Sequence, residues 1–162
     1  MRIFVGMIIR EYNEKDWYKV VEIYAKVKMD ELRFEKKQFE FLPLEKDKKR
    51  LNELKESDIY ICQDSEIVGY GALHDNEIRA VYVIPSERGK GIGKCLFEFL
   101  LSKVNGSPVL YVAKTNFPAK KLYKQYGFVV TNEFETIYNG KSVFAHEMEQ
   151  VFKPKQVANK SL

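Results

Sequence analysis

The sequence predicts a single α/β (α+β) domain in which helices flank one mixed, mostly antiparallel sheet. The chain has 162 residues, close to the ~150 residues of one ordinary domain. Short apolar runs rich in β-branched residues alternate with segments whose apolar residues recur at helical spacing. Several of these runs follow one another across short turns, which indicates an antiparallel meander. The predicted order of elements is β-α-α-β-β-β-α-β-α-β-β.

The composition excludes several classes of protein. Hydrophobic residues make up 45% and charged residues 31%, and no apolar run approaches the ~18 residues that span a bilayer, so we expect neither disorder nor a membrane partner. No cleavage site follows the first apolar stretch, so we expect a cytoplasmic protein. The net charge of +4 is spread along the chain, and no basic stripe interleaves with aromatic residues, so we expect no nucleic-acid partner.

The first part of the chain combines one clear helix with an irregular segment. Asn13 offers a side-chain oxygen that caps this helix, with Asp16 as its third residue. Its apolar residues recur on one face, at Trp17, Val20, Tyr24 and Val27. The other predicted elements here are a strand at 7–12, an irregular segment at 29–44 and a short charged helix at 47–56. Residues 1–6 precede the first strand and are predicted to be a dispensable extension.

The remainder of the chain reads as a meander followed by alternating strands and helices. Its predicted elements are strands at 59–63, 67–73 and 77–84, a helix at 94–104, a strand at 109–113, a helix at 119–126, and strands at 133–138 and 141–148. Gly127 is placed to end a helix in the left-handed conformation. Asn139-Gly140 is the strongest hairpin signal in the chain. The edges of this last hairpin make a homodimer possible. Residues 151–162 are predicted to be a flexible tail.

A glycine-rich loop, RGKGIG at 88–93, joins a predicted strand to a predicted helix. Backbone N–H groups at a helix N-terminus, together with the helix dipole, favour an anion such as phosphate. The motif G-x-x-x-x-G-K-[ST] is absent, and G-x-G-x-x-G fails because Leu96 stands where its last glycine is required. On the loop alone, a tight turn without a ligand is the alternative.

Two motifs resemble the GNAT superfamily of N-acetyltransferases. The segment VYVIPSERGKGIG at 81–93 looks like the acetyl-CoA signature of this family, whose core [QR]-x-x-G-x-[GA] is filled by Arg88, Gly91 and Gly93. The segment NFPAKKLYKQYGF at 116–128 is similar to the family pattern N-x-x-A-x-x-L-Y-x-x-x-G-F. The resemblance covers about residues 7–148. It implies a GNAT-like fold and one acetyltransferase domain over residues 1–150.

The resemblance also implies a reaction and a cofactor. The activity would be transfer of an acetyl group from acetyl-CoA to a primary amine, by direct attack and without a covalent enzyme intermediate. The residues expected to hold the cofactor are the main chain of Val81, Tyr82 and Val83, the loop residues Arg88, Gly89, Lys90, Gly91, Ile92, Gly93 and Lys94, and Asn116 with Tyr123. Candidates for the 3′-phosphate of the cofactor are Lys114, Lys120, Lys121 and Lys124, although most of these are expected to be ordinary solvated lysines.

Acyl transfer to an amine needs a base and is helped by an acid. Our candidate base is Glu77, because some family members place a glutamate there and an even separation puts its side chain on the same face as that of Val83. The alternative for Glu77 is an ordinary glutamate at a strand end, and His74 and Glu147 are weaker candidate bases. Tyr123 matches the tyrosine acid of the family, whereas its structural alternative is a core residue.

The acceptor is left open by the sequence. The family builds the acceptor pocket from the loop between its first two helices, so Phe34, Phe39, Phe41 and Tyr138 are candidates to line it, with packing beneath a long loop as their alternative role. The rival function is a catalytically inactive acyl-CoA sensor or interaction module of the same fold. Cys62 and Cys95 form no C-x-x-C pair, so we expect packing roles for them and no metal.

Overall fold

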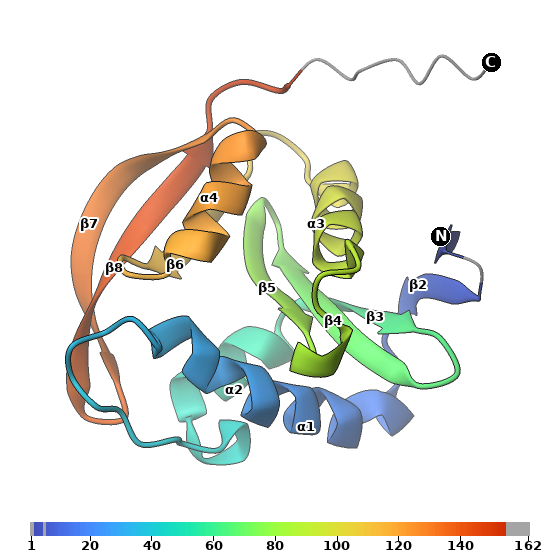
Figure 1. Ribbon diagram of the computed structural model, residues 1–162, viewed down its shortest axis with the longest axis horizontal. Coiled ribbons are helices and arrows are strands. Elements are labelled where there is room, and N and C mark those ends of the chain that lie inside the picture. Colours follow the sequence, from blue (N-terminus) through green and yellow to red (C-terminus); the bar gives the residue numbers. More distant parts are fainter. Residues whose placement is uncertain (1, 5, 155–162) are drawn as a thin grey trace.

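A computed structural model describes residues 2–4 and 6–154 of the chain. Within these ranges the strands form one sheet of eight, in the order β1-β2-β3-β4-β5-β6-β8-β7 (Figure 1). The strands are β1 (Arg2–Phe4), β2 (Met7–Glu11), β3 (Asp58–Gln63), β4 (Ile67–His74), β5 (Glu77–Val83), β6 (Val109–Ala113), β7 (Phe128–Tyr138) and β8 (Lys141–Gln150). The helices are α1 (Trp17–Val27), α2 (Lys48–Lys55), α3 (Ile92–Lys103) and α4 (Phe117–Gln125), with short 3-10 helices η1 (Glu14–Asp16), η2 (Lys28–Leu32), η3 (Leu44–Lys46) and η4 (Pro85–Glu87).

The sheet is mixed and mostly antiparallel, which confirms the predicted fold class. The one parallel pair among the described strands is β5 with β6. These two strands pair only where Glu77 meets Val109 and Ile78 meets Leu110. Further along, β5 continues to pair with β4 and β6 with β8. The sheet therefore divides into two halves that part between β5 and β6.

Helices cover both faces of the sheet (Figure 1). On one face, α1 and α2 pack against side chains of β3, β4 and β5. On the other face, α3 and α4 contribute Phe97 and Tyr123 to a second apolar cluster that contains Ile78 of β5 and Leu110 of β6. Because the second cluster contains residues of both β5 and β6, the layer of α3 and α4 bridges the division of the sheet. Among the described helices, none is both long and apolar enough to cross a bilayer.

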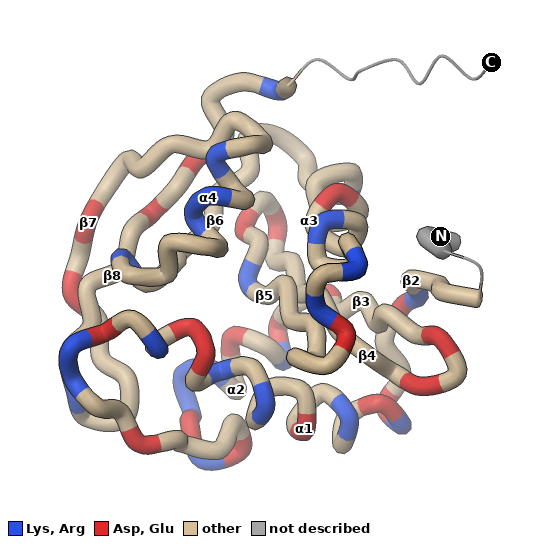
Figure 2. The backbone as a smooth tube through the Cα atoms, in the orientation of Figure 1, with Lys and Arg blue, Asp and Glu red and all other residues tan. Residues whose placement is uncertain are grey.

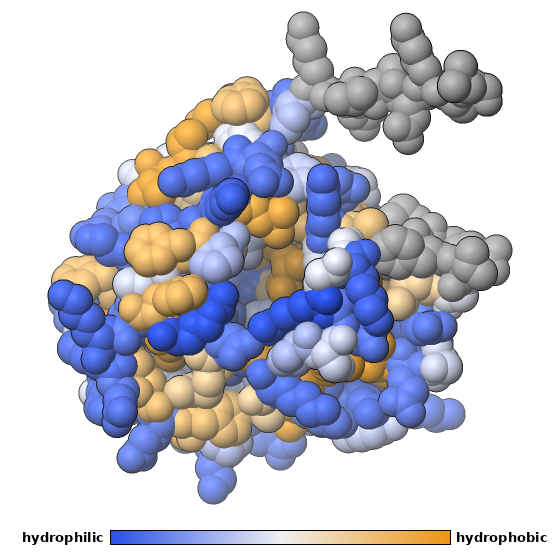
Figure 3. Space-filling model, viewed as in Figure 1, coloured by the Kyte–Doolittle hydropathy of each residue, from blue (hydrophilic) through white to orange (hydrophobic). Residues whose placement is uncertain are grey.

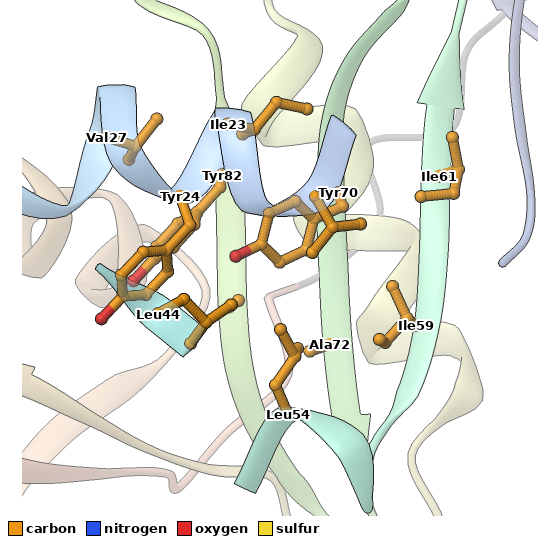
Figure 4. Close-up of a cluster of buried hydrophobic side chains, with 12 residues drawn as sticks. Ile23, Tyr24, Val27, Leu44, Leu54, Ile59, Ile61, Tyr70, Ala72 and Tyr82 are labelled. Carbon is orange, nitrogen blue, oxygen red and sulfur yellow. The ribbon is translucent and has the colours of Figure 1, made fainter. Parts of the chain in front are cut away.

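The first helix follows its predicted pattern closely. Lys15 N donates to Asn13 Oδ1 at 3.0 Å, and Asn13 N donates to Asp16 Oδ2 at 2.8 Å, which is the reciprocal bonding of a capping box. Its buried face consists of Val20, Ile23, Tyr24 and Val27. Figure 4 shows these α1 side chains meeting those of β3, β4 and β5.

The prediction that residues 1–6 are a dispensable extension is wrong for the part that the structure describes. Residues 2–4 form β1, which pairs antiparallel with β2 and adds an edge strand to the sheet. Gly6 permits the connecting turn because its φ of +84° lies in the left-handed region that glycine adopts without strain. The element order therefore begins with two strands instead of one.

Three elements begin earlier than their sequence patterns predicted. Helix α3 begins at Ile92 because Gly91 serves as its N-cap. Helix α4 begins at Phe117, with Pro118 in its first turn, where the missing N–H has no helical partner to lose. Strand β7 begins at Phe128 and not at 133. Most of its residues are exposed and its register with β8 shifts near Val130, so no regular alternation marks it in the sequence.

The start of the predicted tail contacts the body of the domain. Val151 N donates to Gly127 O at 3.0 Å. Gly127 has a φ of +83°, as expected for a left-handed helix end, and a Cβ there would lie 1.9 Å from Phe152 O. Residues 155–162 of the predicted tail lie outside the described residues.

Candidate functional site

A cavity of about 730 Å³ lies where β5 and β6 part. Its walls come from α1 and η2 on one side, from β5 and β6 in the middle, and from α4 and β7 on the other side. Figure 3 shows the surface hollowed at the centre of the view, with apolar side chains inside and hydrophilic ones around the rim. A deep cleft of this size, with an apolar floor and a few polar groups, has the character of a ligand site.

The glycine-rich loop brings the start of α3 to this cavity. Arg88 lines the cavity, and Gly89 and Gly91 follow it with φ values of +81° and +80°. Gly91 provides no side-chain cap, and the helical hydrogen bonds begin with Cys95 N donating to Gly91 O. The backbone N–H groups of residues 92–94 therefore have no partner within the helix. Such N–H groups, with the positive end of the helix dipole, favour an anion.

Lys and Arg positions gather at the start of α3 and along α4 (Figure 2). Arg88 forms an ion pair with Asp30 of η2, with Nη1 2.5 Å from Oδ2. Lys90 pairs with Glu87 at 2.7 Å, and Lys94 is exposed. The loop thus presents positive charge beside its free amides, and Arg88 is already engaged with a carboxylate from the opposite side.

One edge of β5 is open where the sheet divides. Val81, Tyr82 and Val83 pair with residues 69–71 of β4 on one side. On the other side, pairing with β6 ends at Ile78 within the described residues. Val81 and Tyr82 line the cavity, whereas the side chain of Val83 packs toward α3. An extended ligand with amide groups can add to such an edge as a strand would.

Tyr123 projects from α4 into the wall of the cavity. Its ring centroid lies 5.1 Å from that of Phe97, so α3 fixes the ring in place. Burial, together with the negative charge of Glu31, raises the pKa of the Tyr123 phenol above its ordinary value. The phenol is therefore protonated at neutral pH and able to donate a proton.

Asn116 lies at the cavity, whereas the four candidate lysines are not among the residues that line it. Asn116 is buried, precedes α4 and lines the cavity. Lys120 is buried too, and its Nζ donates to Lys114 O at 3.2 Å. Burial and the neighbouring cations Lys124 and Lys114 lower the pKa of Lys120. Lys121 and Lys124 are exposed, as expected for solvated lysines.

Glu77 lines the cavity, but not on the face that we predicted. Leu73 pairs with Ile78 and Ala72 pairs with Ala80, so β5 carries a bulge at the residue between them. Ile78 and Val83 both pack against α3, although they are five positions apart and regular alternation would put them on opposite faces. Glu77 therefore lies on the face opposite to Val83, and the predicted shared face is wrong because the bulge reverses the alternation.

Arg79, the extra residue of this bulge, holds the Glu77 carboxylate. Its Nε donates to Glu77 Oε2 at 3.0 Å, and its Nη1 donates to Glu56 Oε1 at 2.5 Å and to Glu53 O at 2.8 Å. The guanidinium thus ties the start of β5 to the end of α2. The sequence pattern gave no sign of this arrangement.

The two weaker candidate bases lie elsewhere. His74 Nδ1 is 3.2 Å from Glu56 O, and its other ring nitrogen is 3.6 Å from the Asp75 carboxylate. Glu147 Oε1 accepts a hydrogen bond from the Tyr111 hydroxyl at 3.2 Å. Neither His74 nor Glu147 is among the residues that line the cavity.

Of the four side chains that we expected around an acceptor, only Tyr138 lines the cavity. Phe34 is 48% exposed and its ring packs on that of Phe117. Phe39 lies 6.3 Å from Tyr138, between ring centroids, and lines a separate cavity of about 380 Å³. Phe41 is partly exposed and is also outside the larger cavity. Each of the three phenylalanines instead packs on an aromatic ring of another element, and the ring of Phe41 lies 6.5 Å from that of Tyr24, between centroids.

The cysteines show no sign of a chemical role. Both are free, and Cys62 is fully buried. Burial raises the pKa of the Cys62 thiol to about 11, which disfavours the reactive thiolate. Within the described residues, no cluster of His, Cys, Asp and Glu has the arrangement of a metal site.

Part of the chain is similar to one family of known proteins. The family described as "Acetyltransferase (GNAT) domain" matches residues 55–130. A curated relative, peptidyl-lysine N-acetyltransferase YjaB of Salmonella typhimurium, is 34% identical over 83 residues, which is 51% of this chain and 57% of the relative. The chain thus spans little more than half the length of this relative.

Two solved structures are similar over nearly their whole length. The solution structure of apo YjaB from Escherichia coli has a TM-score of 0.68 at 25% identity and covers 90% of this chain and 97% of its own. A GNAT phosphinothricin acetyltransferase from Sinorhizobium meliloti, solved in complex with acetyl-CoA, has a TM-score of 0.65 at 16% identity and covers 97% of this chain and 98% of its own. The second similarity concerns the fold alone.

Proposed function

We propose that this chain, which matches the acetyltransferase (GNAT) family over residues 55–130, transfers the acetyl group of acetyl-CoA to the nitrogen of a primary amine. The observation that carries this proposal is the cavity at the division of the sheet. It joins the glycine-loop residue Arg88, the open edge at Val81 and Tyr82, and the protonated phenol of Tyr123. These are the groups that a thioester cofactor and its leaving thiol require.

Different parts of the cofactor would contact different parts of the cavity wall. Its pyrophosphate would lie against the free N–H groups of residues 92–94, and the amides of its pantetheine arm would pair with the open edge of residues 81–83. Asn116 lines the cleft at the start of α4, where polar atoms of the cofactor can reach it. The acetyl-CoA complex of the Sinorhizobium meliloti enzyme, which shares the fold, supports this cofactor.

The reaction is a nucleophilic acyl substitution. The neutral amine attacks the thioester carbonyl carbon, a C–N bond forms, and the carbonyl electron pair moves to oxygen, where a backbone N–H of β5 would stabilise it. The C–S bond then breaks, its electron pair leaves on sulfur, and Tyr123 would give that thiolate a proton. The amine nitrogen loses one proton, for which Glu77 is the proposed acceptor. The products are an amide and free coenzyme A.

Thiol release tests this proposal. Purified protein is incubated with acetyl-CoA and separately with spermidine, phenethylamine, Nα-acetyl-lysine amide and an alanine-initiated peptide, and free thiol and acetylated amine are both measured. The lysine derivative is included because the curated relative carries the name of a peptidyl-lysine acetyltransferase. We expect amine-dependent thiol release with at least one acceptor. Stabilisation by coenzyme A without thiol release from any amine would instead indicate a binding module.

A further inference from the structure

One carboxylate on the cavity wall, that of Glu31, lies at the end of the cavity formed by η2 and the tyrosine rings. Glu31 belongs to η2 and lines the cavity. Its Oε2 accepts a hydrogen bond from Lys28 Nζ at 2.9 Å, and both side chains are largely shielded, at 26% and 11% exposure. The other carboxylates on the walls include Asp30 and Glu77, which are bound by arginines.

Tyrosines from four different elements surround this end of the cavity: Tyr24 of α1, Tyr70 of β4, Tyr82 of β5 and Tyr138 of β7. The ring centroid of Tyr82 lies 6.1 Å from that of Tyr24 and 5.3 Å from that of Tyr70. Figure 4 shows Tyr24 and Tyr82 side by side, with Tyr70 directed toward them. Burial and the charge of Glu31 raise the pKa values of Tyr70 and Tyr82 well above their ordinary values. These hydroxyls are therefore neutral.

The hydroxyl of Tyr24 is buried without a hydrogen-bond partner among the described residues. Tyr24 as a whole is only 4% exposed. A buried polar group without a partner is unfavourable in a folded protein, and a ligand group that bonds to it would relieve that cost. Tyr24 is one of the side chains that line the cavity, so a ligand in the cavity lies next to it.

Lys28 shows how this cavity accommodates a primary ammonium group. Its Nζ is bound by the Glu31 carboxylate and lies 5.9 Å and 5.3 Å from the ring centroids of Tyr24 and Tyr138. Carboxylate contact and aromatic faces are both favourable for an alkyl ammonium ion. A ligand ammonium placed here would replace one such ion by another. If Lys28 turned toward solvent and a ligand ammonium took its place, the net charge of the cavity and the hydrogen bond to the Glu31 carboxylate would both be kept.

We propose that the acceptor binds as a primary ammonium ion on Glu31, in the place that Lys28 occupies, with the Tyr24 hydroxyl as a second polar contact. This inference rests on the proposed acetyl transfer and names the group that recognises its acceptor. Glu31 acts in binding and positioning, and the proton that the amine loses goes to another group. The ligand class is a monoamine with a compact apolar or aromatic body that fits among the tyrosine rings.

The test uses two variants with opposite expected effects. Binding of phenethylammonium to the complex with free coenzyme A is measured by calorimetry, which needs no turnover. Glu31→Gln keeps the side-chain shape, removes the charge, and should weaken binding by roughly 10- to 100-fold, in line with the worth of a shielded charged hydrogen bond. Lys28→Met removes the competing ammonium and should tighten binding several-fold. Coenzyme A affinity should stay unchanged in both variants.

Glu22→Gln is the matched control. Glu22 is also a carboxylate that pairs with lysines, Lys19 and Lys26, but it is exposed and lies outside the cavity. We expect this variant to bind phenethylammonium as the wild type does. Unchanged binding in Glu31→Gln, weaker binding in Lys28→Met, or no binding to the wild type would each overturn the inference. Binding with these shifts but without thiol release from any amine would uphold the site on Glu31 and refute the proposed transfer.

Discussion

The two ends of the cavity are built in different ways. The end that we propose for the cofactor, the cofactor end, uses the contiguous segments 81–94 and 116–123, and much of its proposed chemistry comes from backbone groups at the start of α3 and along β5. The acceptor end gathers side chains from α1, η2, β4 and β7, which are far apart in sequence. Backbone chemistry leaves a compact motif because glycine positions and helix starts are local. A site built from side chains of distant segments leaves no sequence motif, because only the fold brings these side chains together.

The largest expected effect belongs to the backbone end. Gly91 has a φ of +80° at the N-cap of α3, and Gly91→Glu would place bulk and negative charge at the proposed pyrophosphate site. A ligand at 100 times its Kd stabilises the native state by ~2.7 kcal/mol. We expect this thermal stabilisation by acetyl-CoA to disappear in the variant.

Gly106→Glu controls for backbone strain in that experiment. Gly106 has a φ of +90° and open space around it, so the substitution imposes a similar conformational cost away from the cavity. It should lower the melting temperature of the free protein and leave the shift caused by acetyl-CoA intact. If Gly91→Glu keeps the full shift, the glycine loop does not hold the pyrophosphate.

Tyr123→Phe tests a side chain that belongs to the cofactor end. The substitution keeps the ring against Phe97 and removes only the hydroxyl, so coenzyme affinity should be retained while kcat falls roughly 10²- to 10⁴-fold. Because burial raises the pKa of Tyr123, loss of its proton should not reduce the wild-type rate below pH ~10, where an ordinary phenol titrates. Steady-state kinetics and a coenzyme titration on one preparation provide the measurement.

Tyr126→Phe is the neighbouring control for this variant. Tyr126 also packs on Phe97, at 5.1 Å between ring centroids, but its hydroxyl bonds to Glu98 outside the cavity. We expect nearly wild-type kcat from it. A loss of stability and coenzyme binding together in Tyr123→Phe would make its hydroxyl a structural group.

Glu77→Gln tests the point where the two ends meet. We expect kcat/KM to fall by roughly 10²-fold near neutral pH, at the low end for a general base, because solvent can take over part of the proton transfer. The deficit should shrink as the pH approaches ~10.4, where an alkyl ammonium loses its proton unaided. Glu147→Gln, outside the cavity, should leave the profile unchanged. A Glu77→Gln profile equal to that of the wild type would assign the proton to another acceptor.

The same contrast explains what the sequence was able to predict. The capped helix at Asn13, the Asn139-Gly140 hairpin and the loop at Gly91 each depend on a few adjacent residues, and the structure contains all three. The bulge beside Ile78 depends on packing between strands and reversed the expected face of Glu77. Glu31 lies in a segment without periodicity. Its spacing from Lys28 did not predict a site, because the site exists only where α1, β5 and β7 enclose both residues.

The smallest expected effect concerns the contact that joins the two ends. Arg88 of the glycine loop pairs with Asp30 of η2, next to Glu31 in the chain. Asp30→Asn should free Arg88 for the pyrophosphate and raise coenzyme A affinity. The two side chains are 41% and 38% exposed, and an exposed ion pair is worth only about 0.2–1 kcal/mol, so the gain should be at most about 5-fold. The gain should shrink at high salt because exposed charges are screened.

In an Arg88→Ala background the same substitution should have no effect. If Asp30→Asn changes affinity equally with and without Arg88, the ion pair does not link the ends. If Asp30→Asn raises affinity only when Arg88 is present, cofactor binding breaks the ion pair and so releases η2, the segment that carries Glu31.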